Sequence, residues 1–261
     1  TQQSQGGANR AVSTLYYDYD ADDIRRDITV VPYEWSKELN NGNAHVTLSG
    51  LNKMCFGKLR YEWMKRIVTS TNDDGVNWQY MRLADVYLMA AEAENELGNT
   101  AAAWTYMKPV LDRALPAAKV AALQTKYTAS QQAFREGIYD QRALEFAGEA
   151  LRKADLVRWG IIDEKMAEAK AKLQALQTRT GAYAGLPDKV YINNAEDASA
   201  IQVYGLNMGE DDATVINTLD GWESKNWFGT ADKPTLTDDI VDGLYVATPS
   251  MNCLWPIWQN F

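Results

Sequence analysis

The pattern of apolar and polar positions changes character near residue 79. In QYMRLADVYLMAAEAENELG, which runs from residue 79 to 98, apolar or small side chains recur every three or four positions. They are Tyr80, Leu83, Ala84, Tyr87, Ala90, Ala91 and Leu97. This spacing predicts an α-helix. Gly98 predicts its end, because glycine readily adopts the left-handed conformation that often follows a helix.

A second helix is expected to follow directly, capped by Asn99 or Thr100 and running through AAAWTYMKPVLDRAL. Pro109 predicts a kink or a break within it, and Pro116 predicts its end. The small or turn-forming residues Ala91, Gly98, Ala103 and Pro116 are spaced as in a tetratricopeptide hairpin, which this pair of helices resembles.

Further helices are predicted downstream. One is expected to begin at Thr128 or Ser130, and a second helix or a continuation to carry Leu151 to Gly160. Residues 163–181 are rich in strong helix formers and predict another helix that ends at Gly181. We therefore expect one convincing helical hairpin and a second pair, fewer than the three or so that repeat arrays normally need.

The two flanks have a different pattern. Residues 1–78 carry short β-like runs between Asn, Gly and Pro, and residues 181–261 hold scattered Trp and Tyr among Gly, Asn and Asp. We expect turns, short strands and long loops in both. The predicted fold class is mainly α, with tetratricopeptide-like hairpins over residues 79–180 and a large, irregular, loop-rich α+β remainder in one domain spanning 1–261.

Composition narrows the function. A formal net charge of −9 disfavours a nucleic-acid surface, and no apolar run is long enough to span a bilayer. The single His45 excludes the usual Ser/His and Cys/His nucleophiles and histidine-rich zinc sites. Nine Trp and fourteen Tyr against five Phe suit half-exposed binding surfaces, although single Trp residues more often fill a core.

Three stretches together resemble the C-terminal half of the SusD/RagB family, outer-membrane nutrient-binding lipoproteins. They are MRLADVYLMAAEAENELG, DQRALEFAGEALRKADLVRWG and the terminal LWPIW. The chain departs from the family pattern at three positions, where Gln141 replaces Glu, Ala150 replaces Gly and Trp258 replaces Pro. The resemblance is strong over residues 79–160 and moderate at the end.

The resemblance implies a binding protein rather than an enzyme, with no cofactor, although some members of the family bind calcium. It implies capture of a glycan or another small nutrient at the extracellular face of the outer membrane. The partner that it implies is a TonB-dependent transporter, with membrane association through a lipid anchor outside this chain. The alternative is a tetratricopeptide-like interaction module that docks on a transporter without a glycan site of its own.

Charged residues in EFAGEALRKADLVRWG suggest either paired catalytic carboxylates or a scaffold. They follow one another at steps of three or four residues, the spacing of one helical face: Arg142, Glu145, Glu149, Arg152, Asp155 and Arg158. Each acid has an Arg nearby, which keeps a carboxylate ionised and makes it a poor general acid. We interpret the set as a structural ion-pair ladder and expect no catalytic residue.

Aromatic loops are the better candidates for a site. A sugar ring offers flat C–H faces and a rim of hydroxyls, so a glycan site needs Trp or Tyr platforms beside polar side chains. Trp222, Trp227 and Asn226 in LDGWESKNWFGT fit this need, and so do Tyr33 and Trp35 in VVPYEW. A hydrophobic plug over the helices is an equally good interpretation of Trp222 and Trp227.

Other patterns left alternatives open. The acidic loops NMGEDDAT and TNDDG contain oxygen ligands that suit Ca²⁺, but lack EF-hand spacing, and solvated loops explain them better. We predict no metal site. Cys55 and Cys253 would pair only if the fold brought them together. A glycoside hydrolase would need an unpaired carboxylate pair in a groove, for which the sequence has no sign.

Overall fold

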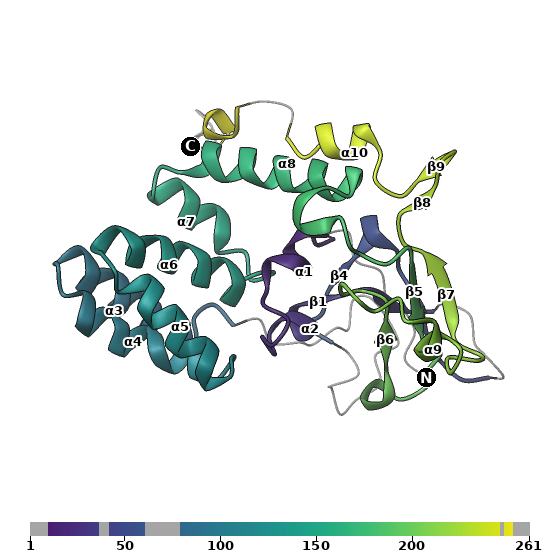
Figure 1. Cartoon of the computed structure of the whole chain (residues 1–261). Helices are drawn as coiled ribbons and strands as arrows, with labels where there is room; N and C mark the ends of the chain where they lie inside the picture. Colours follow the sequence, from purple (N-terminus) through teal and green to yellow (C-terminus); the bar gives the residue numbers. More distant parts are fainter. Residues whose placement is uncertain (1–9, 37–41, 61–78, 246–247, 253–261) are drawn as a thin grey trace, which may run out of the picture. The chain divides into compact units, whose positions relative to one another are not determined.

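The computed structural model describes residues 10–36, 42–60, 79–245 and 248–252 of the chain (Figure 1). It divides into two compact units. The helical unit comprises Asp18–Thr29 and Val76–Arg152. The loop-rich unit comprises Thr1–Tyr17, Val30–Gly75 and Lys153–Phe261. The described residues form ten α-helices and a few small sheets, so the predicted fold class, mainly α, is confirmed.

The helical unit is built from two consecutive antiparallel helix pairs and a short helix from the N-terminal part of the chain (Figure 1). Its helices are α2 (Arg26–Thr29), α3 (Leu83–Glu96), α4 (Thr100–Asp112), α5 (Ala117–Tyr127) and α6 (Gln131–Glu145). The α3 helix packs against α4 and α6, and α5 packs against α6 and α4. Their apolar side chains form the core; among the fully buried ones are Leu88, Met107, Leu111, Phe134 and Ile138.

Local sequence explains most of these boundaries. The first helix ends where Gly98 takes a positive φ of 86°, as expected. The Ser130 hydroxyl caps α6 by accepting a hydrogen bond from the Ala133 N–H at 3.0 Å. Gly137 lets the Tyr127 ring of α5 lie against α6, since a Cβ there would stand 2.6 Å from that ring.

Two details of this region differ from what the sequence indicated: of the kink or break expected at Pro109 the break does not occur, and one more helix forms. The α4 helix continues through Pro109 to Asp112, so there is no break at the proline. Residues 117–127, which we did not predict as helical, form α5, and Pro116 stands at its N-cap. Proline has no N–H to lose at the start of a helix, so it begins one as readily as it ends one. The second hairpin is therefore α5 with α6.

The charged stretch 145–160 is not one helix. The α6 helix ends at Glu145, and α7 (Arg152–Arg158) begins only after a turn. Within the turn, Gly148 and Ala150 have positive φ angles of 78° and 62°. Ala150 is the position where the resembled family has glycine, the residue that takes this conformation without strain. The boundary between the two units also falls here, after Arg152.

The loop-rich unit contains α1 (Thr14–Asp18), α7, the long helix α8 (Ile162–Thr178), two short helices and four small antiparallel sheets. The short helices are α9 (Ala213–Ile216) and α10 (Asp238–Asp242). The two-stranded sheets pair β1 (Val30–Val31) with β4 (Cys55–Phe56), β2 (Tyr33–Trp35) with β3 (Val46–Leu48), and β8 (Gly229–Thr230) with β9 (Lys233–Pro234). The three-stranded sheet has the order β6 (Val203–Tyr204), β5 (Lys189–Ile192), β7 (Glu223–Asn226).

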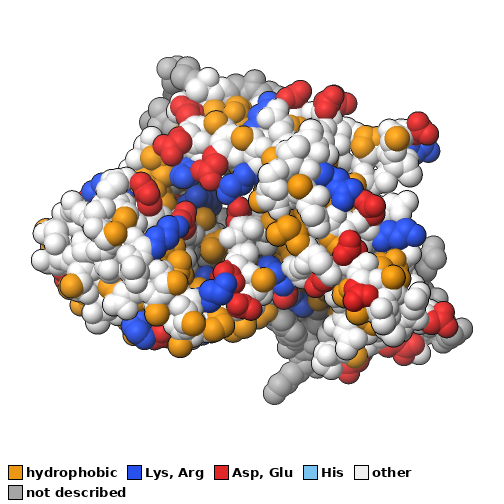
Figure 2. All heavy atoms as spheres, viewed as in Figure 1, with side chains coloured by type: hydrophobic (Ala, Val, Ile, Leu, Met, Phe, Trp, Pro, Cys, Tyr) orange, Lys and Arg blue, Asp and Glu red, His pale blue; other side chains and the backbone are white. Residues whose placement is uncertain are grey.

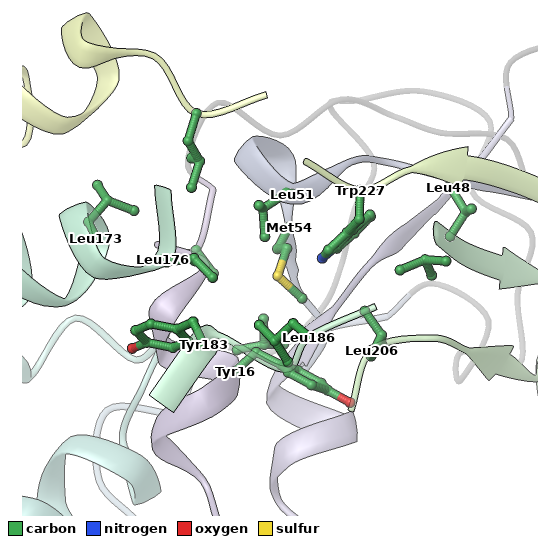
Figure 3. Close-up of a cluster of buried hydrophobic side chains, with 14 of the residues drawn as sticks. Tyr16, Leu48, Leu51, Met54, Leu173, Leu176, Tyr183, Leu186, Leu206 and Trp227 are labelled. Carbon is green, nitrogen blue, oxygen red and sulfur yellow. The ribbon is translucent and has the colours of Figure 1, made fainter. Parts of the chain in front are cut away.

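The core of this unit gathers side chains from segments far apart in the sequence (Figure 3). Leu173 and Leu176 of α8 face residues from the N-terminal strands and from the last third of the chain. Leu48, Leu51, Met54, Leu186, Leu206 and Trp227 belong to this cluster. Fully burying one such large apolar side chain contributes about 1.5–3 kcal/mol. The irregular segments are thus held by a common core rather than by extended sheets.

Candidate functional site

The two aromatic segments singled out in the sequence both lie in the loop-rich unit, and strand β3 links them. The first, Tyr33–Trp35, is strand β2, paired with β3 so that Trp35 lies opposite Val46 and Tyr33 opposite Leu48. The second contains strand β7, preceded directly by Trp222. Strand β3 lies against β7, so residues 175 to 177 positions apart in the sequence become neighbours.

Specific hydrogen bonds fix this contact. The Thr47 hydroxyl donates to the carboxylate of Glu223, whose oxygens lie 2.8 and 3.0 Å away. The Leu48 N–H donates to the same carboxylate at 3.3 Å, and the Lys225 ammonium donates to the Leu48 carbonyl at 2.6 Å. Glu223 and Lys225 therefore hold β7 against β3. Trp222 and Asn226 stand next to them in sequence, at positions whose side chains alternate with theirs along the strand.

The candidate residues differ in how much of each side chain reaches solvent. Tyr33, Trp35 and Trp222 are half-buried, while Asn226 is exposed at the end of β7 opposite Lys189. Tyr33 and Trp35 pack against the core of the unit on one side. A half-buried aromatic ring of this kind is held in a fixed orientation while part of its surface remains available.

Tyr33 is further positioned by Arg60. The Arg60 guanidinium donates to the Tyr33 hydroxyl at 2.8 Å and lies 5.9 Å from the centre of its ring. On the neighbouring position of β2, the Glu34 carboxylate pairs with Arg10 at 3.2 Å, and Arg10 also donates to the Cys55 sulfur at 2.6 Å. Burial raises the pKa of the Cys55 thiol, although the Arg10 charge opposes the shift. Cys253 lies outside the described residues.

Trp227 does not lie at the surface. Its side chain is only 1% exposed and packs in the core beside Leu51 and Met54 (Figure 3). Its backbone N–H donates to the Asp188 carbonyl at 2.7 Å, which continues the pairing of β7 with the chain before β5. The plug that the sequence allowed as an alternative describes Trp227, so we correct the candidate set by removing it.

In the acidic loop 207–214, the carboxylate of Glu210 is hydrogen-bonded within the loop. One oxygen of Glu210 accepts hydrogen bonds from the backbone N–H groups of Gly205, Leu206 and Asn207, at 2.9 to 3.0 Å. The Asn207 amide donates to the other oxygen at 2.7 Å. In the part of the chain that the structure describes, no three His, Cys, Asp or Glu side chains converge in a way that would hold a metal ion. Residues 71–75 lie outside that part.

The charged stretch around Glu145 forms a network within the helical unit. The Glu145 side chain is 2% exposed and pairs with three arginines: Arg25 at 3.0 Å, Arg82 at 2.5 Å and Arg113 at 2.5 Å. Burial opposes its ionisation, but the hydrogen bonds from Arg82 and Arg113 and the nearby charge of Arg25 outweigh burial and lower the pKa of the carboxyl group.

The arginines of this network have further acidic partners. Arg25 also pairs with Asp23 at 2.6 Å, and Arg82 with Glu149 at 2.8 Å. Arg82 lies over one side of the Phe146 ring, 4.6 Å from its centre. With every carboxylate next to a guanidinium, the network supplies no proton donor for acid catalysis.

The remaining members of the expected ladder have varied contacts. Arg142 pairs with Asp85 of α3 at 2.6 Å and lies 4.8 Å from the Phe146 ring centre. Arg152 donates to the Tyr139 carbonyl at 3.0 Å. In the loop-rich unit, Asp155 pairs with Arg158 at 3.0 Å, the i,i+3 pair that the sequence suggested.

Sequence reasoning missed the arginines that surround Glu145. Arg25 lies 120 residues from Glu145, Arg82 lies 63 residues away and Arg113 lies 32 residues away. The helical spacing around Glu145 pointed only to neighbours three or four positions away. Arg82 is the second residue of the motif MRLADVYL, and this motif is the one sequence signal that could have identified it.

The surface carries both signs of charge. On the face seen in Figure 2, Lys and Arg side chains lie among Asp and Glu side chains and do not form one continuous basic area. No helix of the described residues is long and apolar enough to cross a membrane.

Fold and site together define a class: helical-repeat proteins that carry half-buried aromatic side chains on a loop-rich second unit. The comparisons with known proteins name the family. The sequence profile of the SusD family matches residues 9–260, so the chain belongs to the SusD family.

One curated relative and one solved structure are similar to the chain. Over 84 residues, which make up 31% of this chain and 15% of the relative, the chain is 52% identical to the SusD-like protein P25 of Formosa agariphila. A crystal structure of a SusD homolog from Bacteroides thetaiotaomicron is similar in fold, with a TM-score of 0.50 and 20% identity. That match covers 68% of this chain and 38% of the other. The chain thus spans less than half the length of either relative.

Proposed function

We propose that the chain is part of a non-catalytic protein that binds an oligosaccharide at the outer surface of a bacterium and delivers it to a TonB-dependent transporter. Membership of the SusD family supports binding and nutrient uptake as the general role. The proposed ligand contacts are Trp222 and Asn226 from one segment and Tyr33 and Trp35 from the other.

The observation that carries the proposal is that both segments are tied to the same strand, β3. Each was a candidate by composition alone; strand β2 pairs with β3, and the Thr47–Glu223 hydrogen bonds hold β3 against β7, so β3 links the two segments. Half-buried aromatic side chains beside polar ones are the combination that a carbohydrate-binding surface needs.

The chemistry of the residues suits a sugar. A half-buried indole such as that of Trp222 offers an apolar face to the C–H groups of a pyranose ring. The exposed amide of Asn226 supplies both a donor and an acceptor for hydroxyl groups. The carboxylates nearest to these side chains, Glu34 and Glu223, are occupied by Arg10 and Thr47 and serve the scaffold instead.

The experiment is a glycan-array and affinity-gel screen of the chain, followed by two variants, Trp222→Ala and Trp35→Ala. We expect each variant to weaken retention about tenfold, equivalent to about 1.4 kcal/mol of binding free energy. The matched control is Tyr106→Ala, which removes an aromatic ring on α4 that is 38% exposed. It should leave retention unchanged.

Two results would count against the proposal. Retention that survives both Trp replacements in folded protein would remove these residues from the site. Turnover of a retained glycan would show an enzyme and contradict the non-catalytic role. Delivery is tested separately, by asking whether the transporter co-purifies with the protein from detergent-solubilised outer membranes.

A further inference from the structure

The three-stranded sheet of the loop-rich unit covers the core with one of its faces. Its strand order is β6, β5, β7 (Figure 1). Val190 and Ile192 of β5 are fully buried members of the core cluster, and Val203 of β6 packs against that cluster. Side chains alternate between the two faces of a strand, so the residues at the intervening positions point away from the core. We call the face that they form the outer face.

The register of the strands identifies the residues of the outer face. Tyr191 of β5 lies opposite Tyr204 of β6 and opposite Ser224 of β7, and Lys189 lies opposite Asn226. Residues directly opposite each other in an antiparallel pair have their side chains on the same face. The two tyrosines are half-buried, and the other three side chains are exposed. Within the three strands, the outer face therefore consists of these five residues.

Trp222 extends the outer face beyond the end of β7. It stands two positions before Ser224, which places it on the same side of the extended chain. Tyr191 and Tyr204 have Cβ atoms about 5 Å apart, and Trp222, diagonal to Tyr191, stands about 7–8 Å from it. A sugar ring is similar in size to one aromatic ring. A row of three half-buried rings therefore fits a chain of sugars better than a single sugar.

The polar groups of the outer face are available to a ligand. Within the part of the chain that the structure describes, none of the five side chains forms a hydrogen bond or an ion pair with another residue. The Ser224 hydroxyl and the Asn226 amide each provide a donor and an acceptor, which suits the hydroxyl groups of a sugar. Together with the rings, they supply both parts of a carbohydrate-binding surface.

The outer face also differs in charge from the rest of the chain. The chain has 35 Asp and Glu against 26 Lys and Arg, yet none of the five outer-face residues is acidic and Lys189 is basic. The acid next to Lys189 in sequence, Asp188, pairs with Arg179. The Lys189 ammonium can therefore donate to an anionic group of a ligand, either the carboxylate of a uronic acid or a sulfate ester.

We propose that the outer face binds an acidic oligosaccharide. Its sugar rings lie on Tyr191, Tyr204 and Trp222, and its carboxylate or sulfate faces Lys189. Asn226, opposite Lys189, contacts the neighbouring hydroxyl groups. This inference rests on the proposed function, because it names the class of glycan that the protein would bind. It adds the two tyrosines and the lysine to the ligand contacts.

The first experiment compares acidic oligosaccharides with matched neutral ones. The probes are trigalacturonate and trimannuronate beside their methyl esters, and sulfated galactotriose beside unsulfated galactotriose, with binding measured by isothermal titration calorimetry. We expect the acidic form to bind about three- to fivefold more tightly, the effect of one exposed ion pair. Preference within the uronate pairs identifies a carboxylate, and preference within the sulfated pair identifies a sulfate. Raising NaCl from about 0.05 M to about 1 M should remove the preference, because salt screens charges.

The second experiment assigns the preference to residues. Lys189→Gln should abolish the preference for the acidic form, whereas Lys233→Gln, at an exposed lysine of β9 outside this sheet, should leave it unchanged. Tyr191→Leu should weaken binding of both forms by about threefold or more, and Tyr191→Phe, which keeps the ring, should not. Urea unfolding checks the fold of each variant. Lys189→Gln changes an exposed side chain, so the test remains valid if Tyr191→Leu is unstable.

The outcomes separate this inference from the proposed function. Equal binding of the acidic and neutral forms, or a preference that survives Lys189→Gln, would overturn the acidic ligand and leave glycan binding intact. Binding that is unchanged by Tyr191→Leu in folded protein would remove the outer face from the site. A chain that retains no oligosaccharide at all would contradict the proposed function, and this inference with it.

Discussion

Replacing Glu145 with Gln would remove one negative charge from the middle of the helical unit while keeping the size of the side chain. Three arginines point hydrogen-bond donors at the Glu145 carboxylate, and the group is 2% exposed. A neutral amide has one acceptor oxygen in place of two, and its NH₂ group would face guanidinium donors. The change therefore leaves the three surrounding arginines with one counter-ion fewer.

The size of the effect follows from the three contacts. A hydrogen bond to a charged group contributes about 1.5–3 kcal/mol, so three would sum to roughly 5–9 kcal/mol if they were independent. They are not independent, because burying the ions costs free energy that the same contacts must offset. Arg113 is 55% exposed, and its share is under about 1 kcal/mol.

Remaining partners reduce the loss further. Arg25 keeps Asp23 at 2.6 Å, and Arg82 keeps Glu149 at 2.8 Å, so neither cation is left wholly unpaired. Breaking a buried pair typically costs about 3–5 kcal/mol. We therefore expect Glu145→Gln to lower the free energy of unfolding of the helical unit by about 3 kcal/mol.

The assay must resolve the helical unit, because a chain with two compact units need not unfold in a single two-state transition. Native-state hydrogen exchange of the α4 and α6 amides does so, with urea unfolding followed by circular dichroism as support. The control is Glu136→Gln, which removes an exposed acid of the same helix and should change the free energy by less than about 0.5 kcal/mol. A loss below about 1 kcal/mol for Glu145→Gln would refute the assignment of Glu145 as the centre of the network.

The remaining predictions concern acid stability and backbone strain. Because the pKa of Glu145 is lowered in the folded state, its stabilising contribution is present above the unfolded value near 4.5 and is lost as the pH falls through the folded pKa. Between pH 6 and pH 3, the unfolding midpoint of Glu145→Gln should therefore fall less steeply than that of the unchanged chain. Ala150→Gly should stabilise the chain by about 0.5–1 kcal/mol in urea unfolding, because φ is 62° there, whereas Ala143→Gly inside α6 should destabilise it by about 1 kcal/mol. Gly137→Ala should cost about 1–3 kcal/mol by forcing the Tyr127 ring away from α6, and adding Tyr127→Leu should recover part of that loss; no recovery would argue against the clash.

The sequence predicted the regular parts of the fold well. Helix α3 and helix α8 were expected within a few residues of where they lie, because apolar periodicity and strong helix formers are local signals. Helix α5 was missed although AAKVAALQTKY is a good helix former throughout. Pro116 indicates the end of one helix, but a proline is equally compatible with the start of the next, and here it is the N-cap of α5.

The site candidates show where local reasoning stops. Trp222 and Trp227 flank the same strand, five residues apart, in a loop of similar composition. Position along the strand separates them: Trp222 precedes β7 and is half-buried, while Trp227 follows it and enters the core beside Met54. That choice depends on which face of β7 the rest of the chain covers, and the covering residues, such as Leu51, come from far away in the sequence.

The charged stretch 145–160 shows, in energetic terms, the same limit of reasoning from local spacing. Pairs at i,i+3 or i,i+4 on an exposed helix contribute only about 0.2–0.5 kcal/mol each, so local spacing identifies pairs of small effect. The contacts of Glu145 join helix α6 to residues 32, 63 and 120 positions away, and burial gives the contacts with Arg25 and Arg82 the larger effect. A buried carboxylate pairs with whichever cationic side chains the tertiary structure places beside it. The spacing around Glu145 therefore indicated that the stretch is charged and paired, whereas the identity of the partners is a property of the tertiary structure.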